Sequence, residues 1–152
     1  LYAGLMFTKK GIYLIEYNVR LGDPECQSIL TRIKTDFLKV CKFVVNEKIK
    51  KIDINLDKKV CLCVVIASKG YPEKYTKNIS LKMLKKLKTE SNIKIYHAGT
   101  KLDKKNNLVS NGGRVLGLVV KKKNVNETIA YLYKKINQVD WKNLFYRSDI
   151  GS

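Results

Sequence analysis

The chain has 152 residues and a formal net charge of +18 at pH 7, from 31 Lys and Arg against 13 Asp and Glu. Apolar residues make up 45% of it, as in a globular protein with a packed core. No apolar run approaches the roughly 20 residues that cross a bilayer, so we expect no membrane partner. The first residues, LYAGLMF, are typical of a strand and lack an initiator Met, which predicts a piece of a longer protein.

The positive charge comes almost entirely from Lys that is scattered along the chain. Arg, which is favoured for bidentate recognition of phosphates and bases, is scarce. The four arginines are Arg20, Arg32, Arg114 and Arg147. A basic nucleic-acid-binding module is the alternative interpretation, but it would need clustered Arg, interleaved aromatic residues or a known motif. We therefore interpret the Lys as a solvated surface and expect no nucleic-acid partner.

The cysteines predict neither disulfides nor a zinc site. Cys26, Cys41, Cys61 and Cys63 form no CxxC pair, and the single histidine, His97, does not complete a zinc set at the usual spacing. Reduced, structural thiols in a cytoplasmic protein are the expected account. For His97 itself, a structural role at a strand end is more typical than general-base catalysis.

The first third of the chain predicts a hairpin, a loop and helices. Residues 1–7 and 12–17 are two β-rich runs joined by a turn that contains glycine, which indicates a β-hairpin. Residues 18–25 have no apolar periodicity and form a loop, and 29–33 predict a short helix or turn. Thr35-Asp36 is a helix start signal, because apolar residues then recur at helical spacing.

A polar stretch, 48–59, predicts a linker, and mainly strands are expected beyond it. The continuous apolar run 60–67 indicates a buried strand. An amphipathic helix is expected at 128–136, and Asn126 could cap it. The remaining expected elements are a weak helix at 81–87, strands at 93–96, 108–109 and 114–120, and turns at 69–72, 103–107 and 111–113.

The stretch IEYNVRLGDPE, residues 15–25, has the clearest chemical pattern. Glu16 and Asn18 are two residues apart at a strand end and so project from the same face. One anionic and one neutral oxygen suit a hard cation such as Mg²⁺, which takes one or two protein oxygens. Arg20 continues that face and could contact a phosphoryl oxygen, and loop 22–25 adds two carboxylates. Turn chemistry alone also explains such a junction, so the spacing leaves both interpretations open.

Six sequence blocks resemble successive signatures of the glycinamide ribonucleotide synthetase (phosphoribosylamine–glycine ligase) family. They are YAGLM, IEYNVRLGDPE, KGYPEKY, YHAGTK, SNGGRVLGL and FYRSDIG, and they run in the family's order from Tyr2 to Gly151. The resemblance implies an ATP-grasp enzyme of purine biosynthesis with an α+β fold. Residues 1–52 would close the ATP-grasp domain as an antiparallel hairpin plus helices, 53–59 would be a linker, and 60–152 would form a small β-rich C-terminal domain with one or two helices.

The resemblance also implies the reaction and the roles of individual residues. Such enzymes join glycine to 5-phosphoribosylamine through a glycyl phosphate, and ATP becomes ADP and phosphate. Mg²⁺ or Mn²⁺ would bind Glu16 and Asn18, Arg20 would act on phosphate, and Asp23 would help to hold glycine or the amine-bearing substrate. The missing N-terminal part of the same enzyme is an implied partner, so this chain alone is expected to be inactive. A different ATP-grasp carboxylate–amine ligase is the alternative enzyme.

The glycine pair before the last long strand is a further candidate for substrate contact. The backbone around Gly112 could approach a phosphate, and Arg114 would add positive charge. The other interpretation is a turn that needs two glycines, followed by a solvated side chain. Both remain open from the sequence.

Overall fold

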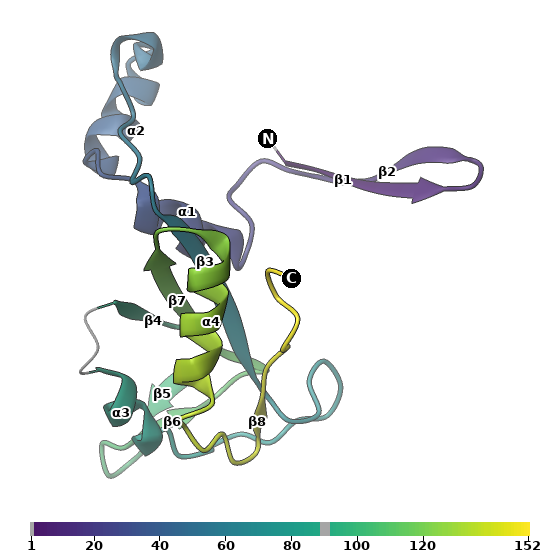
Figure 1. The fold of residues 1–152 in the computed structure, drawn as a ribbon, viewed down its shortest axis with the longest axis vertical. Coiled ribbons are helices and arrows are strands. Elements are labelled where there is room, and N and C mark those ends of the chain that lie inside the picture. Colours follow the sequence, from purple (N-terminus) through teal and green to yellow (C-terminus); the bar gives the residue numbers. More distant parts are fainter. Residues whose placement is uncertain (1, 89–91) are drawn as a thin grey trace.

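The computed structural model describes residues 2–88 and 92–152, so Leu1, which the first predicted strand includes, lies outside the described residues. The fold is mixed, with antiparallel sheets and few helices (Figure 1). In the described part, no helix is both long and apolar enough to span a bilayer. The elements in chain order are β1 (Tyr2–Thr8), β2 (Gly11–Asn18), α1 (Glu25–Arg32), α2 (Phe37–Val45), the 3₁₀ helix η1 (Ile49–Lys51), β3 (Val60–Ser68), the 3₁₀ helix η2 (Lys82–Leu84), α3 (Lys85–Lys88), β4 (Ile93–His97), β5 (Thr100–Leu102), β6 (Leu108–Ser110), β7 (Arg114–Lys122), α4 (Val125–Ile136) and β8 (Leu144–Phe145).

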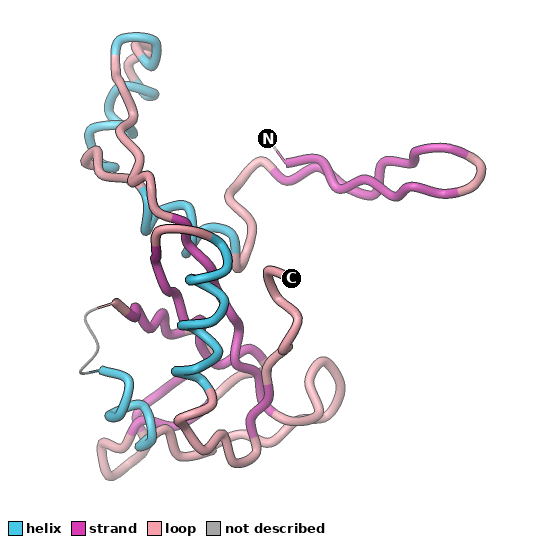
Figure 2. Tube along the Cα trace, viewed as in Figure 1, coloured by secondary structure: helices cyan, strands magenta, loops and turns pink. Residues whose placement is uncertain are grey.

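The N-terminal hairpin forms as predicted and extends away from the rest of the chain (Figure 2). Its strands pair antiparallel from Tyr2 opposite Asn18 to the turn at Gly11, whose φ of 128° suits glycine. A shift in register after Gly4 adds one residue to β2. Strand alternation then places Glu16 and Asn18 on the same face as their partners on β1.

Two helices follow the hairpin, and the second begins where the sequence indicates. The Asp36 carboxylate accepts hydrogen bonds from the backbone N–H groups of Leu38 (2.8 Å) and Lys39 (3.3 Å), which confirms the predicted helix start. The first helix, α1, is longer than the short helix or turn predicted at 29–33. Its buried Thr31 hydroxyl lies 2.8 Å from the Tyr96 hydroxyl, which anchors α1 beside β4.

The segment between α2 and β3 is hydrogen-bonded to its neighbours. The backbone N–H of Lys34 donates to the Asn55 carbonyl at 2.8 Å, and the N–H of Asp57 donates to the Arg32 carbonyl at 2.7 Å. Lys121 Nζ lies 2.6 Å from Asp57 Oδ2, and this hydrogen bond is the main reason why the pKa of Asp57 is lowered to about 2. The predicted linker is therefore tied both to the end of α1 and to β7.

A four-stranded antiparallel sheet in the order β4-β7-β3-β8 carries the main core. The predicted strand 60–67 is confirmed as β3, and Val64 and Ile66 on it are fully buried. Helix α4 contacts β3 and β7 and buries Leu132 and Ile136. Trp141 belongs to this core, and its Nε1 donates to the Ile136 carbonyl at 2.8 Å. Strands β5 and β8 were not predicted, since three and two residues are too few to show a period.

The predicted cap of the last helix is wrong by two residues. Asn124, not Asn126, is the N-cap of α4: its side-chain oxygen accepts from the Glu127 N–H at 2.9 Å, and its amide donates to Glu127 Oε1 at 2.7 Å. The apolar periodicity begins at Thr128, but the helix begins one turn earlier at Val125. Asn126 therefore lies inside the first turn and has helical backbone, where it cannot act as the cap.

Candidate functional site

One pocket of about 220 Å³ gathers most of the predicted site residues. It lies where the open end of the hairpin, the loop before α1 and the start of β7 meet. The residues that line it are Tyr2, Glu16, Asn18, Arg20, Gly22, Asp23, Glu25 and Arg114. The structure thus brings Glu16, Asn18, Arg20, Asp23 and Arg114 together, although Arg114 is far from the others in sequence.

Glu16 and Asn18 present free oxygen atoms to this pocket. Within the described part of the chain, neither side chain has a hydrogen-bond or ion-pair partner. Gly4 lies opposite Glu16, and a Cβ there would come within 3.2 Å of Glu16 Cγ, so glycine leaves the carboxylate room to move. The described residues contain no group of three or more His, Cys, Asp or Glu that could hold a metal ion. A cation at Glu16 and Asn18 would therefore need further ligands such as water or phosphate oxygens, which fits Mg²⁺.

Arg20 reaches the pocket from a bend, not from the strand. Strand β2 ends at Asn18, so the prediction that Arg20 continues its face is wrong in that detail. The chain bends at residues 19 and 20, directly after Asn18 pairs with Tyr2 as the last described pair of the hairpin. Arg20 Nη1 donates to the Leu21 carbonyl at 3.1 Å, and the guanidinium still lines the pocket.

The loop before α1 holds Asp23 against Arg114. Arg114 Nη1 lies 3.2 Å from Asp23 Oδ2 and also donates to the Asp23 carbonyl at 3.4 Å. On the other side, Gln27 Nε2 donates to Asp23 Oδ1 at 2.9 Å. A Cβ at Gly22 would meet only the carboxylate end of the flexible Glu25 side chain, which shows how closely Glu25 approaches this loop. The Asp23–Arg114 contact joins residues 91 positions apart and connects the loop to the C-terminal sheet.

Gly112 is not among the residues that line this pocket. Its carbonyl accepts a hydrogen bond from Ser68 Oγ at 3.0 Å, and a Cβ added at Gly99 would lie 2.6 Å from its Cα. Next to it, a Cβ at Gly113 would collide with the Tyr71 ring. Close packing against the Gly99 backbone accounts for Gly112, and close packing against the Tyr71 ring accounts for Gly113. His97 also lies outside the pocket, exposed at the end of β4, with Nδ1 3.2 Å from Thr100 Oγ1.

A second, mainly apolar pocket of about 290 Å³ lies beside the first and shares Arg114 with it. Cys63, Tyr71 and Phe145 are on its walls. Burial, followed by the nearby Cys61 thiol and acidic groups, raises the pKa of Cys63 to about 12, so this thiol stays protonated at neutral pH. None of the four cysteines is in a disulfide in this structure.

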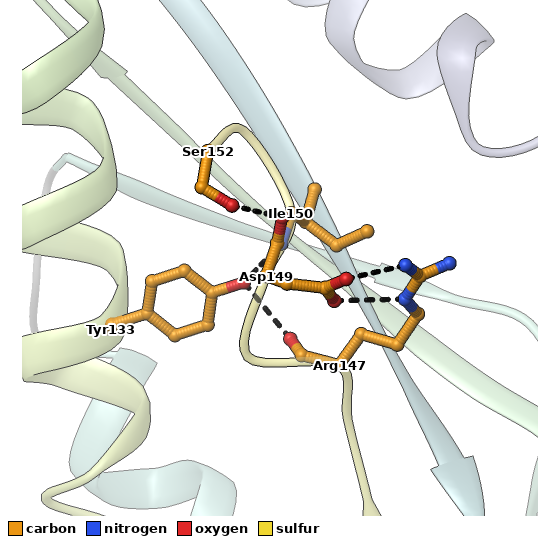
Figure 3. A network of polar contacts seen from close by, with 5 residues as sticks. All are labelled: Tyr133, Arg147, Asp149, Ile150 and Ser152. Carbon is orange, nitrogen blue, oxygen red and sulfur yellow. Dashed lines mark hydrogen bonds and ion pairs between the residues drawn. The ribbon is translucent and has the colours of Figure 1, made fainter.

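The C-terminal block RSDIG forms one side of the apolar pocket through the polar network of Figure 3. Arg147 holds Asp149 with two contacts, Nε to Oδ1 at 2.9 Å and Nη2 to Oδ2 at 2.6 Å. The Tyr133 hydroxyl of α4 donates to the Arg147 carbonyl at 2.9 Å and accepts from the Ile150 N–H at 3.0 Å. Through these two hydrogen bonds, α4 holds the C-terminal segment 147–150 in place.

Sequence reasoning missed two residues at the site, Tyr2 and Gln27. Tyr2 lines the pocket because it pairs with Asn18 across the hairpin, which the register of the strands would have indicated. Gln27 contacts Asp23, four positions earlier. Side chains four residues apart lie on the same face of a helix, so a helix placed directly after the loop would have predicted that Gln27 contacts Asp23.

Comparisons with known proteins agree with the resemblance. The family model "Phosphoribosylglycinamide synthetase, C domain" matches residues 61–152. The phosphoribosylamine–glycine ligase of Caldanaerobacter subterraneus subsp. tengcongensis is 39% identical over 152 residues, which are 100% of this chain and 36% of the relative. The Agrobacterium fabrum ligase is 43% identical over 150 residues, 99% of this chain and 35% of that protein. The chloroplastic ligase of Arabidopsis thaliana is 40% identical over 154 residues, 99% of this chain and 29% of that protein.

A solved structure shows the same similarity in three dimensions. The crystal structure of phosphoribosylamine–glycine ligase from Thermotoga maritima superposes with a TM-score of 0.72 at 30% identity, covering 97% of this chain and 36% of that one. This chain thus spans about a third of the length of the relatives that it matches. With more than half of its residues matched by the C-domain model, the chain belongs to the phosphoribosylglycinamide synthetase family.

Proposed function

We propose that this chain is the C-terminal part of an ATP-dependent ligase of de novo purine biosynthesis. The ligase would join glycine to 5-phosphoribosylamine through a glycyl phosphate, giving glycinamide ribonucleotide, ADP and phosphate. The observation that carries the proposal is the single pocket shared by Glu16, Asn18, Arg20, Asp23 and Arg114. The names of the relatives, phosphoribosylamine–glycine ligase, support the reaction.

The proposal includes the division of the chain that the resemblance implies. Residues 1–52 would complete an ATP-grasp domain, 53–59 would link it onwards, and 60–152 would be the C-terminal domain. One face of the hairpin is apolar and exposed over both strands. This exposure supports the proposal that another part of the ligase covers the hairpin. Its residues are Ala3, Leu5, Phe7, Ile12, Leu14 and Tyr17. An isolated two-stranded hairpin is marginally stable in water, so the rest of the ATP-grasp domain would cover this face.

Glu16 and Asn18 would hold Mg²⁺ or Mn²⁺ on the opposite face of the hairpin. The bound cation would neutralise negative charge on the nucleotide phosphates. Glu16 supplies one negative charge and Asn18 a neutral oxygen, and the lack of competing partners within the described chain leaves both oxygens available. Two protein ligands leave the other coordination positions to water and ATP.

Three further charged residues of the pocket, Arg20, Asp23 and Arg114, would act on the substrates directly. Arg20 would contact the transferring phosphoryl group, where a planar cation stabilises the charge that develops. Asp23 would accept a hydrogen bond from glycine or the amine-bearing substrate, and Arg114 would attract the phosphate of 5-phosphoribosylamine. Gly112 would contribute only through its backbone next to this site. The four free thiols fit a reducing compartment such as the cytoplasm, while the Arabidopsis relative is named chloroplastic.

The test is Glu16→Ala in the full-length ligase, with Glu73→Ala as the matched control because Glu73 is exposed and does not line the pocket. Phosphate release that depends on both glycine and 5-phosphoribosylamine should fall at least about a hundredfold in Glu16→Ala. Glu73→Ala should keep the wild-type rate, and circular dichroism should show the same fold for both. Activity of Glu16→Ala within about tenfold of wild type would contradict the proposed metal site.

A further inference from the structure

Gln27 contacts the proposed site from the first turns of α1. It is half-buried, and its Nε2 donates to Asp23 Oδ1 at 2.9 Å. The second oxygen of the same carboxylate, Oδ2, lies 3.2 Å from Arg114 Nη1. Asp23 is therefore held from two sides, by a neutral donor on α1 and by a cation at the start of β7.

The other end of the Gln27 amide is unusual. Gln27 Oε1 is buried and has no hydrogen-bond partner, and among the described residues it is the one buried side-chain N or O atom in that situation. A buried acceptor without a partner destabilises a fold. Rotating the amide by half a turn would not give Oε1 a donor. It would place Oε1 against the Asp23 carboxylate, and both groups can only accept hydrogen bonds. The orientation of the Gln27 amide is thus dictated by Asp23.

We propose that Gln27 is a positioning residue that fixes the Asp23 carboxylate, and through it the Arg114 guanidinium, for binding the phosphorylated amine. The inference rests on the proposed function. With Oδ1 held by Gln27, Oδ2 keeps its direction towards Arg114. Arg114 uses only Nη1 on Asp23, and its Nε and Nη2 donors have no partner within the described chain. These donors remain available for a phosphate, and fixing them in advance lowers the entropic cost of binding.

The first variant, Gln27→Met, separates positioning from stability. Methionine has a similar size, lacks the donor that holds Asp23, and also lacks the unpaired buried oxygen. In the full-length ligase we expect kcat/KM for 5-phosphoribosylamine to fall about tenfold or more, mainly through KM, because preorganisation is lost. The thermal unfolding midpoint should stay the same or rise. If Gln27 had only a structural role, Gln27→Met would lower the activity and the thermal unfolding midpoint together.

The second variant, Gln27→Glu, adds a readout that depends on pH. Two carboxylates would then meet at Asp23, and at neutral pH, where both are ionised, they would repel each other. On acidification the pair shares a proton, which restores a donor towards Asp23. The activity of Gln27→Glu relative to wild type should therefore rise about threefold or more as the pH is lowered from about 7 to about 5. The charged side chains that surround Asp23 in the pocket are the same in both enzymes, and they are Glu16, Arg20, Glu25 and Arg114.

Gln138→Met is the matched control, because Gln138 is exposed beyond the end of α4 and should keep wild-type kinetics. Wild-type kcat/KM in Gln27→Met, or a Gln27→Glu pH profile that parallels wild type, would overturn the inference while leaving the proposed function standing. A wild-type ligase that forms no glycinamide ribonucleotide would instead refute the proposed function, and this inference with it.

Discussion

The ion pair between Arg114 and Asp23 should matter far more for catalysis than for stability. At 3.2 Å, two unit charges attract by about 1.3 kcal/mol in bulk water. Both side chains are nearly half exposed, at 45% and 48%, so solvent and salt screen the pair. Exposed pairs of this kind contribute about 0–1 kcal/mol. We therefore expect a coupling energy of about 0.5 kcal/mol for the two residues in the free energy of unfolding.

A double-mutant cycle measures this coupling directly. Urea unfolding of the 152-residue chain is followed for wild type, Arg114→Ala, Asp23→Ala and the double variant, at low salt and at about 1 M salt. The coupling should shrink at high salt, where the Debye length falls to about 3 Å. The same substitutions in the full-length ligase should each lower kcat/KM at least about a hundredfold, equal to about 2.7 kcal/mol of transition-state stabilisation.

Lys134→Ala is the control for loss of a positive charge, because Lys134 is exposed on α4 and outside the pocket. It should leave both stability and kcat/KM unchanged. A coupling energy above about 2 kcal/mol, combined with nearly wild-type kcat/KM in Arg114→Ala, would refute the reasoning. The pair would then be a structural clamp between the loop and the sheet, not part of a substrate site.

Two further predictions concern stability. Asn124→Ala should lower the free energy of unfolding by about 1 kcal/mol, and the melting temperature by about 2–4 °C, because the cap to Glu127 is lost. Asn126→Ala should be neutral or slightly stabilising in the same melting experiment, and a larger loss at Asn126 than at Asn124 would contradict the assigned cap. The hydrogen bond to Lys121 lowers the pKa of Asp57 from the usual 3.8 to about 2. The ionised Asp57 carboxylate therefore stabilises the fold fully above about pH 3.8, and this stabilisation disappears as the pH falls through about 2. The unfolding midpoints of wild type and Asp57→Asn should therefore differ at about pH 5 and converge near pH 2, and a constant difference would show that Asp57 acts in another way.

Several elements follow from the sequence because their causes are local. The hairpin depends on β-rich runs around a turn at Gly11, and α2 begins where the Asp36 carboxylate can bond N–H groups two and three residues further on. The apolar run of β3 is long enough to be recognised as a buried strand. By contrast, β8 has two residues and exists because it pairs with the end of β3, a contact that no local pattern records.

The residues of the proposed site also fall into those that local sequence patterns place and those that only the folded chain brings together. Strand alternation alone sets Glu16 beside Asn18, so the sequence by itself determined the pair proposed to bind metal. Only the tertiary structure decided that Arg114 meets Asp23 across 91 positions, that Gln27 holds the same carboxylate, and that Gly112 packs against backbone outside the pocket. The physical reason is the range of the interactions. Periodicity and capping act over a few residues, whereas a pocket forms where the folded sheet and the loop meet.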